Sequence, residues 1–279
     1  CQFANQLNPE SSYEYTHCEI HPSMMFGVMG SQVIFPEHNQ LPRNLFSCGQ
    51  SKQAVSLYHS NFRNRIDTMG VVLNYGDIPL VKSRMLDYIQ EEKHPYGFNT
   101  IVAIMCYNGY NVEDAILINE GSVKRGLFHT TYYNMYEAYE ETSDIGESTS
   151  NKIIKNLKHE STVELNGKYD YNHLDSRGLI RENTIMDDTK VMIGMVSFNE
   201  EDVYQRSDAS VMPKKGQLVM VDKTYVTNDV EGKRIAKVRI REQRIPNYGD
   251  KFCSRCGQKG TIGQIIPEEN MPFTKDGLK

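Results

Sequence analysis

The chain has 279 residues, with 31 Lys and Arg against 36 Asp and Glu, and a formal net charge of −5. Its 39 % hydrophobic and 24 % charged residues are typical of a globular protein and exclude a fibrous or largely disordered one. No apolar run approaches the ~18 residues of a membrane span. Six cysteines are too sparse for a disulfide framework, so we expect a reducing, intracellular compartment.

Both ends of the sequence lack the features of natural termini. Cys1 is not preceded by Met, and the residues after it have neither the basic nor the apolar segment of a signal peptide. The sequence stops at Lys279 without a helix cap or a polar tail. We therefore expect the chain to be a piece of a longer polypeptide.

The first half of the sequence mixes apolar runs with turn signals. Residues 36–44 predict an irregular polar loop, and the apolar spacing in 50–67 predicts a helix. The continuous apolar run 100–106 is typical of a buried strand. Residues 114–119 predict a second strand, and 120–126 predict a short capped helix.

The next part of the sequence has turn signals at short intervals. Short apolar runs lie between them, such as 190–196 and 217–221. This pattern predicts that residues 130–245 form a β-rich, partly looped insertion.

A strongly basic stretch follows, with nine basic and two acidic residues between 233 and 259. Alternation predicts a strand with Lys237, Arg239 and Arg241 on one face and Val238 and Ile240 on the other. Two interpretations are open: a strand that merely has one cationic edge, or a surface that binds nucleic-acid phosphates.

An acidic pair, Glu113 and Asp114, stands at a turn before the predicted strand 114–119. On a regular strand the two carboxylates would point to opposite faces, which excludes a symmetrical acid/base pair. In an irregular turn, either carboxylate could stand beside Mg²⁺, which takes one or two carboxylates and keeps water and phosphate ligands. The alternative is a solvated acidic turn.

Residues 247–263 form the densest candidate site. Glycines let the backbone approach a phosphate closely, and Lys251 and Lys259 supply point charges. The segment is not a Walker loop, because its glycine spacing differs and Thr261 does not directly follow Lys259. The alternative, a flexible surface loop, is disfavoured by the apolar runs on both sides.

Cys253 and Cys256 have the spacing of a metal knuckle. A zinc site needs four ligands, and no second cysteine pair follows. Cys18 and His21 also have ligand spacing, so a composite site with them is an alternative. We expect buried or unreactive thiols and no zinc in this chain.

Several segments occur in the order typical of one protein family. They are residues 15–24, 35–44, 109–114, 125–126, 249–252 and 257–263. The chain resembles the second-largest, β-like subunit of multisubunit DNA-directed RNA polymerases of eukaryotic or large-DNA-virus type. The likeness runs essentially from end to end, but it covers only a central part of such a subunit.

The resemblance implies a mixed α+β, β-rich fold: a double-psi β-barrel hybrid-binding region with an inserted wall (flap) domain. Residues 1–27 would be the end of the external domain, and 28–129 the first part of the hybrid-binding region. Residues 130–245 would be the wall, and 246–279 the second, incomplete part of the hybrid-binding region.

The resemblance also implies roles for basic and amide side chains. Arg43 matches an arginine that faces the incoming nucleotide's triphosphate. Lys52 and Gln53 match positions that line the RNA–DNA hybrid. Lys251 and Lys259 match two lysines that reach the RNA 3′ end and the nucleotide phosphates.

By the same resemblance, Glu113 and Asp114 stand beside the second, nucleotide-borne Mg²⁺, which is shared with the largest subunit. Two positions depart from the family. Cys256 stands where His is usual and cannot supply a positive charge, and Cys253 replaces a small residue.

The function implied is templated RNA synthesis from ribonucleoside triphosphates by two-metal nucleotidyl transfer. This chain would form half of the active site and cradle the hybrid. No Asp-x-Asp-x-Asp run occurs here, so we expect Mg²⁺ to be held mainly by the largest subunit and the isolated chain to be inactive. Implied partners are the largest and the other polymerase subunits, DNA, RNA and nucleotides, without a membrane. The implied location is the nucleus or, for a viral protein, the host cytoplasm or a virus factory. The alternative function is a non-catalytic nucleic-acid-binding module derived from this fold.

Overall fold

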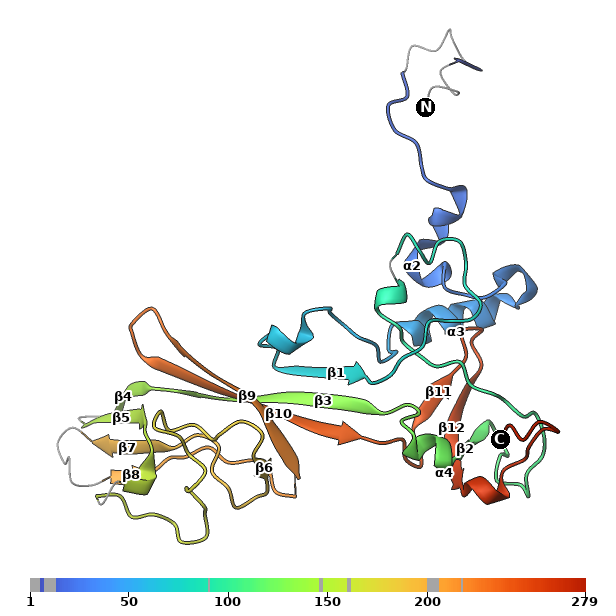
Figure 1. The fold of residues 1–279 in the computed structure, drawn as a ribbon. Coiled ribbons are helices and arrows are strands. Elements are labelled where there is room, and N and C mark those ends of the chain that lie inside the picture. The colour runs from blue at the N-terminus through green and yellow to red at the C-terminus, as the bar shows by residue number, and fades with distance from the viewer. Residues whose placement is uncertain are drawn as a thin grey trace. The chain divides into compact units, whose positions relative to one another are not determined.

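Strands dominate the structure, a computed structural model that describes residues 6–7, 14–89, 91–145, 148–159, 162–199, 206–216 and 218–279. The chain divides into two compact units whose segments alternate along the sequence (Figure 1). Unit 1 comprises Cys1–Ser60, Tyr75–Phe128 and Ile245–Lys279, and unit 2 comprises Asn61–Asn74 and His129–Arg244. The β-rich class predicted from the sequence is therefore confirmed. No helix of the described residues is long and apolar enough to cross a membrane.

Unit 2 is built on two antiparallel sheets. The first has the order β1-β3-β10-β9-β6, and the second has the order β4-β5-β7-β8. The strands of the first sheet are β1 (Met69–Leu73), β3 (Thr130–Tyr139), β6 (Ile185–Met186), β9 (Val219–Asn228) and β10 (Arg234–Arg244). Those of the second sheet are β4 (Glu141–Ile145), β5 (Ser148–Ile154), β7 (Met195–Asn199) and β8 (Arg206–Asp208). Two 3-10 turns, η3 (Phe62–Asn64) and η5 (Leu157–His159), accompany them.

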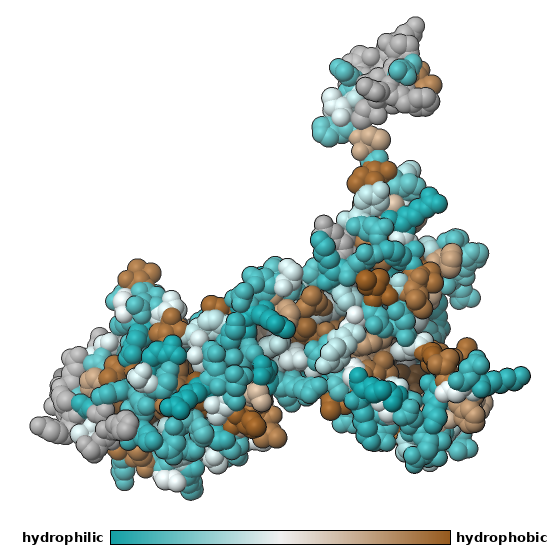
Figure 2. Space-filling model, viewed as in Figure 1, coloured by the Kyte–Doolittle hydropathy of each residue, from teal (hydrophilic) through white to brown (hydrophobic). Residues whose placement is uncertain are grey.

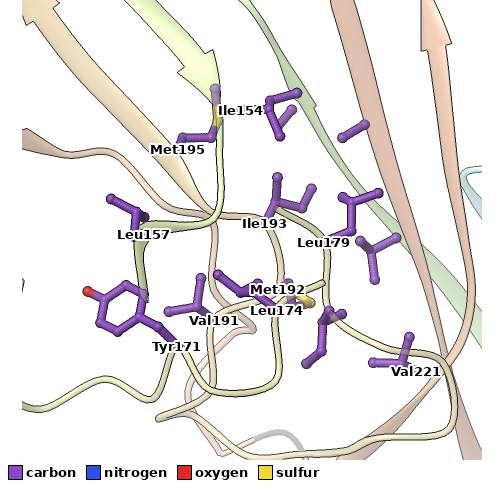
Figure 3. Packing of buried hydrophobic residues seen from close by; sticks show 14 of the residues in the cluster. Ile154, Leu157, Tyr171, Leu174, Leu179, Val191, Met192, Ile193, Met195 and Val221 are labelled. Carbon is purple, nitrogen blue, oxygen red and sulfur yellow. The ribbon is translucent and has the colours of Figure 1, made fainter. Parts of the chain in front are cut away.

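The core of unit 2 is one cluster of buried apolar side chains drawn from both sheets and from the turns that connect them. Figure 3 shows Leu157, Leu179, Met192 and Ile193 within this cluster, on the connecting segments. Each of these four side chains is fully buried. The looped part of the predicted insertion therefore packs as core, although few of its residues are in regular strands.

Unit 1 contains a smaller sheet with the order β11-β12-β2 and several short helices. The strands are β2 (Ala115–Asn119), β11 (Lys251–Cys253) and β12 (Lys259–Ile266). The α-helices are α2 (Gly27–Gly30), α3 (Leu41–Ser51) and α4 (Glu120–Lys124). The 3-10 turns are η1 (Pro22–Phe26), η2 (Pro36–His38), η4 (Glu91–Lys93) and η6 (Glu268–Asn270).

The predicted second strand and capped helix are confirmed as β2 and α4. Asn119 ends the strand and caps the helix, because its side-chain oxygen accepts a hydrogen bond from the Gly121 N–H at 2.9 Å. For the run 190–196, strand β7 begins only at Met195. In the run 217–221, β9 begins at Val219, and Gln217 lies outside the described residues.

Three local predictions are wrong. The helix predicted over 50–67 lies earlier, as α3, because Pro42 suits the first turn of a helix and starts it inside the predicted loop 36–44. The apolar run 100–106 is not a buried strand: it pairs with no described strand, and Ile104 is 98 % exposed. Figure 2 shows such hydrophobic residues on the surface, in brown. An apolar run predicts burial, but it does not supply the neighbouring strand that burial requires.

The strand predicted around Lys237, Arg239 and Arg241 is confirmed as β10, although carboxylates neutralise its cationic face. Val238 and Ile240 are buried as expected, but Arg239 on the opposite face is only 4 % exposed. Its guanidinium lies 2.6 Å from the Asp222 carboxylate, and Asp222 also binds Arg241 at 3.1 Å. Asp222 occupies an irregularity in the β9–β10 register, where Lys223 pairs with Arg239 and Val221 with Ile240. The remaining cations of β10 are also paired, in the ion pairs Arg234–Glu140, Lys237–Glu137 and Arg244–Glu242.

The pair Arg234–Glu140 predicts a pH dependence of unit 2 stability. Burial alone would raise the pKa of Glu140, but hydrogen bonds from Arg234 and from the Ile154 N–H outweigh it and lower the pKa below 4.5. A lowered carboxyl pKa stabilises the fold above about pH 4.5, and this stability is lost as pH falls through the folded pKa.

We therefore expect Glu140→Gln to lower the unfolding free energy at pH 7 by about 1.5–3 kcal/mol. The difference from wild type should shrink below pH 4, in chemical denaturation followed by circular dichroism. A difference that stays constant between pH 7 and pH 3 would contradict this.

Candidate active site on the β11–β12 hairpin

The β11–β12 hairpin places two lysines on one exposed face. Cys253 pairs with Lys259, and Lys251 pairs with Thr261. Opposed residues and every second residue share a face, so Lys251 and Lys259 are diagonal neighbours, roughly 7–8 Å apart. Phe252 points to the other face, where its ring lies 4.4 Å from that of Phe128. The hairpin is thus anchored on its apolar side and presents its cations outward.

The acidic pair lies beside this hairpin. β2 runs parallel to β12, with Ala115 opposite Thr261, so the turn before β2 lies next to the start of β12. The Thr261 N–H donates to the Asp114 carbonyl at 3.1 Å, and Gln258 Nε2 donates to the Asp114 carboxylate at 3.3 Å. The structure therefore brings together an acidic turn and a lysine hairpin that are 144 residues apart in sequence.

The turn that carries the acidic pair is irregular. Both residues have left-handed backbones, Glu113 with φ 55° and Asp114 with φ 62°. Non-glycine residues in this region are uncommon and concentrate at functional sites. Both side chains are exposed. The two carboxylates therefore do not follow strand alternation. From the sequence, such an irregular turn was the condition for either carboxylate to stand beside Mg²⁺.

Helix α3 brings Arg43 to the turn of the hairpin. The Arg43 guanidinium donates to the Gly257 carbonyl at 3.4 Å. Lys52 caps the other end of the helix, nine residues later, which is about 13 Å along the axis. Gln53 follows Lys52. The structure thus places Arg43 at the hairpin turn, and Lys52 and Gln53 at the opposite end of α3.

The lysines of the hairpin and the cations of β10 differ in whether they form ion pairs. Within the described part of the chain, neither Lys251 nor Lys259 forms an ion pair with a carboxylate, whereas the β10 cations are paired internally. A cation without an internal partner keeps its charge for a ligand. The capacity to bind phosphate therefore resides in the hairpin more than in the basic strand that precedes it.

The acidic pair fits a shared Mg²⁺ better than a complete metal cage. Glu113 and Asp114 supply two carboxylates, and the described residues contain no group of three or more His, Cys, Asp or Glu that could hold a metal. Mg²⁺ commonly takes one or two protein carboxylates and completes its octahedron with water and phosphate. The composite zinc site of Cys253 and Cys256 with Cys18 and His21 is likewise not assembled in the described residues. The Cys256 thiol instead lies 3.9 Å from the Ile34 carbonyl.

Three residues at the hairpin were missed by the sequence analysis. The Ser47 hydroxyl donates to the Arg255 carbonyl at 2.6 Å. The Arg255 side chain donates to the Tyr96 hydroxyl, outside the hairpin, and Gln258 donates to the Asp114 carboxylate. Arg255 and Gln258 lie within segment 247–263, where the glycines and lysines carried the prediction. Ser47 gives no local signal, because its partner is 208 residues away.

Gly257 allows the hairpin turn to approach α3 closely. A Cβ at this position would lie against the Arg43 carbonyl oxygen, and the backbone has φ 83°. We expect Gly257→Ala to lower the unfolding free energy by about 2–4 kcal/mol, through backbone strain and steric overlap. Urea denaturation followed by circular dichroism measures this.

Gly49 supplies the matched control. It lies within α3, and a Cβ there would meet nothing within 4 Å. Gly49→Ala should therefore stabilise the chain by about 0.5–1 kcal/mol. Similar effects of the two substitutions would contradict the docking of the turn on α3.

A family model described as RNA polymerase Rpb2, domain 6, matches residues 29–279. The chain belongs to this family. This chain is 38 % identical over 282 residues to DNA-directed RNA polymerase II subunit 2 of Arabidopsis thaliana, covering 98 % of this chain and 23 % of that relative. It is 39 % identical over 275 residues to DNA-directed RNA polymerase II subunit RPB2 of Encephalitozoon cuniculi, covering 96 % of this chain and 24 % of that relative.

An archaeal relative is similar to the same degree. DNA-directed RNA polymerase subunit Rpo2 of Sulfolobus acidocaldarius is 38 % identical over 281 residues, covering 98 % of this chain and 25 % of that relative. The chain therefore spans about a quarter of the length of these curated relatives. The resemblance to a second-largest polymerase subunit is confirmed, whereas the eukaryotic or viral type stays a prediction.

Proposed function

We propose that the chain is part of the second-largest subunit of a DNA-directed RNA polymerase and forms half of its active site. Residues 1–27 would end the external domain, the rest of unit 1 would belong to the hybrid-binding region with its double-psi barrel, and most of unit 2 to the wall. The observation that carries the proposal is the pair of outward-facing lysines beside the acidic turn. The relatives that match nearly the whole length of this chain are named as polymerase subunits.

In this proposal the basic side chains neutralise phosphate charge during nucleotidyl transfer. Lys259 and Arg43 would face the nucleotide triphosphate, Lys251 the RNA 3′ end, and Lys52 and Gln53 the RNA–DNA hybrid. Lys suits a moving phosphate as a mobile point charge, whereas the planar guanidinium of Arg43 can bind phosphate with two parallel hydrogen bonds. Donors aimed at charge that develops in the transition state lower the barrier.

The acidic turn would serve a Mg²⁺ shared with the largest subunit. Glu113 and Asp114 would supply carboxylate oxygens, and Gln258 would hold the Asp114 carboxylate in place. When bound, the ion neutralises charge on the transferring phosphoryl group and leaving group. Because two carboxylates do not make a complete site, the partners would be the largest subunit, the other subunits, DNA, RNA and nucleoside triphosphates. The nucleus, or a viral factory, would be the place of action.

Affinity labelling tests this function. A periodate-oxidised ribonucleoside triphosphate carries aldehydes that form an imine with a nearby lysine, which borohydride then fixes. We expect Lys259 to be labelled in the assembled polymerase and not in the chain alone. Equal labelling without the largest subunit would instead support a non-catalytic nucleic-acid-binding module. The internal pairing of the β10 cations weighs against that alternative, because it removes charge that such a module would use.

A further inference from the structure

The turn that joins β11 to β12 is closed by its own hydrogen bonds. The Ser254 N–H donates to the Gln258 carbonyl at 2.8 Å. The Ser254 hydroxyl oxygen accepts from the N–H groups of Cys256 and Gln258, each at 3.3 Å. The turn therefore behaves as one small rigid piece. Lys251 precedes this piece and Lys259 follows it, so its placement affects both lysines.

One side chain of this turn reaches out of the hairpin. Arg255 donates through Nε to the Tyr96 hydroxyl at 2.9 Å and through Nη1 to the Val81 carbonyl at 3.1 Å. Its guanidinium also lies 5.6 Å from the centroid of the Tyr96 ring. These two partners belong to a segment of unit 1 that contributes neither a strand nor a lysine to the candidate site.

The backbone of the same residue is held from another side. The Arg255 carbonyl accepts the Ser47 hydroxyl of α3 at 2.6 Å, and Ser47 is only 2 % exposed. The buried Arg255 Nη2 has no hydrogen-bond partner among the described residues. Arg255 thus joins the turn to α3 through its backbone and to residues 81–96 through its side chain. It stands four residues from each lysine.

We propose that Arg255 is a positioning residue for nucleotide addition: it fixes the hairpin turn and thereby the positions of Lys251 and Lys259. This inference rests on the proposed function and adds to it a residue that touches neither phosphate nor metal. Its two donors point to two different acceptors, which the planar guanidinium permits. A lysine in its place would be a flexible point charge and would not hold both acceptors at once.

The test uses the assembled polymerase with the full-length subunit carrying Arg255→Ala, Arg255→Lys or Tyr96→Phe. The matched control is Arg125→Ala, an exposed arginine of unit 1 that pairs with Glu268. Two readouts are taken: labelling of Lys259 by a periodate-oxidised nucleoside triphosphate, and the KM and kcat of single-nucleotide addition. Thermal unfolding of each variant reports a purely structural effect.

We expect Arg255→Ala and Arg255→Lys to reduce kcat/KM roughly 10- to 100-fold, because small misplacements of catalytic groups have effects of this size. Lys259 labelling should fall in parallel, Tyr96→Phe should give a smaller loss, and Arg125→Ala should behave as wild type. Unchanged labelling and kcat/KM in Arg255→Lys, with or without a lowered Tm, would overturn this inference but leave the proposed function standing. Absence of Lys259 labelling in the wild-type polymerase would instead overturn the proposed function on which it rests.

Discussion

Replacing Lys251 or Lys259 by alanine in the assembled polymerase is expected to slow nucleotide addition by about 10²–10³-fold, the usual effect of removing one donor that stabilises transition-state charge. Both side chains are exposed on one face of the hairpin, and neither is paired with a carboxylate of the described residues. Binding of the template–RNA hybrid should change little, because each lysine neutralises at most about one phosphate among many. Rapid-quench measurement of single-nucleotide addition, with a filter-binding assay for the hybrid, separates the two effects.

Lys124→Ala is the control for this experiment. Lys124 is exposed on α4 in the same unit, and it pairs with Glu120 at 2.7 Å. Its loss should leave nucleotide addition within about twofold of wild type, because an exposed ion pair contributes little. If Lys124→Ala and Lys259→Ala slow addition equally, or if only hybrid binding falls in the hairpin variants, the catalytic assignment is wrong.

The largest effect on stability is expected for Asp222→Ala in unit 2. Arg239 is almost fully buried, and its guanidinium donates to Asp222 and to the carbonyls of Arg63 and Arg65. The rings of Tyr133 and Tyr225 lie within 6 Å of it, at 5.3 and 5.9 Å. Removal of the carboxylate would leave a buried, uncompensated charge. We expect a loss of about 3–5 kcal/mol in the free energy of unfolding.

Circular dichroism during urea denaturation measures this loss in a chain that has no tryptophan. Glu137→Ala is the control, because it removes an ion pair to Lys237 from the same sheet at a more exposed position. That pair should contribute about 1 kcal/mol or less. A second variant, Asp222→Asn, keeps the shape but not the charge, and should lose nearly as much stability as Asp222→Ala. Equal small losses in all three variants would show that Arg239 does not depend on Asp222.

Local patterns predicted the elements whose causes are local. β2 follows from a short apolar run, α4 from the Asn119 cap, and β10 from the alternation of Val238 and Ile240 with charged residues. The prediction over 50–67 was wrong because apolar spacing in a short segment does not distinguish a helix from an irregular segment, and most residues of this one are exposed. The Pro42 signal for a helix start was interpreted as a loop.

Charge along the sequence was the least reliable guide to the site. The basic residues of β10 and those of the hairpin look alike in sequence. The carboxylates that neutralise β10 come from Glu137 and Asp222 on neighbouring strands, from Glu140 just after β3, and from Glu242 within β10 itself. Cross-strand pairing is decided by register, which a single sequence does not report. The roles of the hairpin lysines, of Arg43 and of the acidic pair came from family resemblance and stay predictions.

By itself, the sequence determined the β-rich class, the family and the identity of the candidate residues, because composition, periodicity and motif order are properties of the chain read in one dimension. Only the tertiary structure decided which of those residues meet. Parallel pairing of β2 with β12 brings the acidic turn to the lysine hairpin, and Arg255 links that hairpin to residues far away in sequence. Contacts of this kind depend on the packing of distant segments, so they leave no local pattern in the sequence.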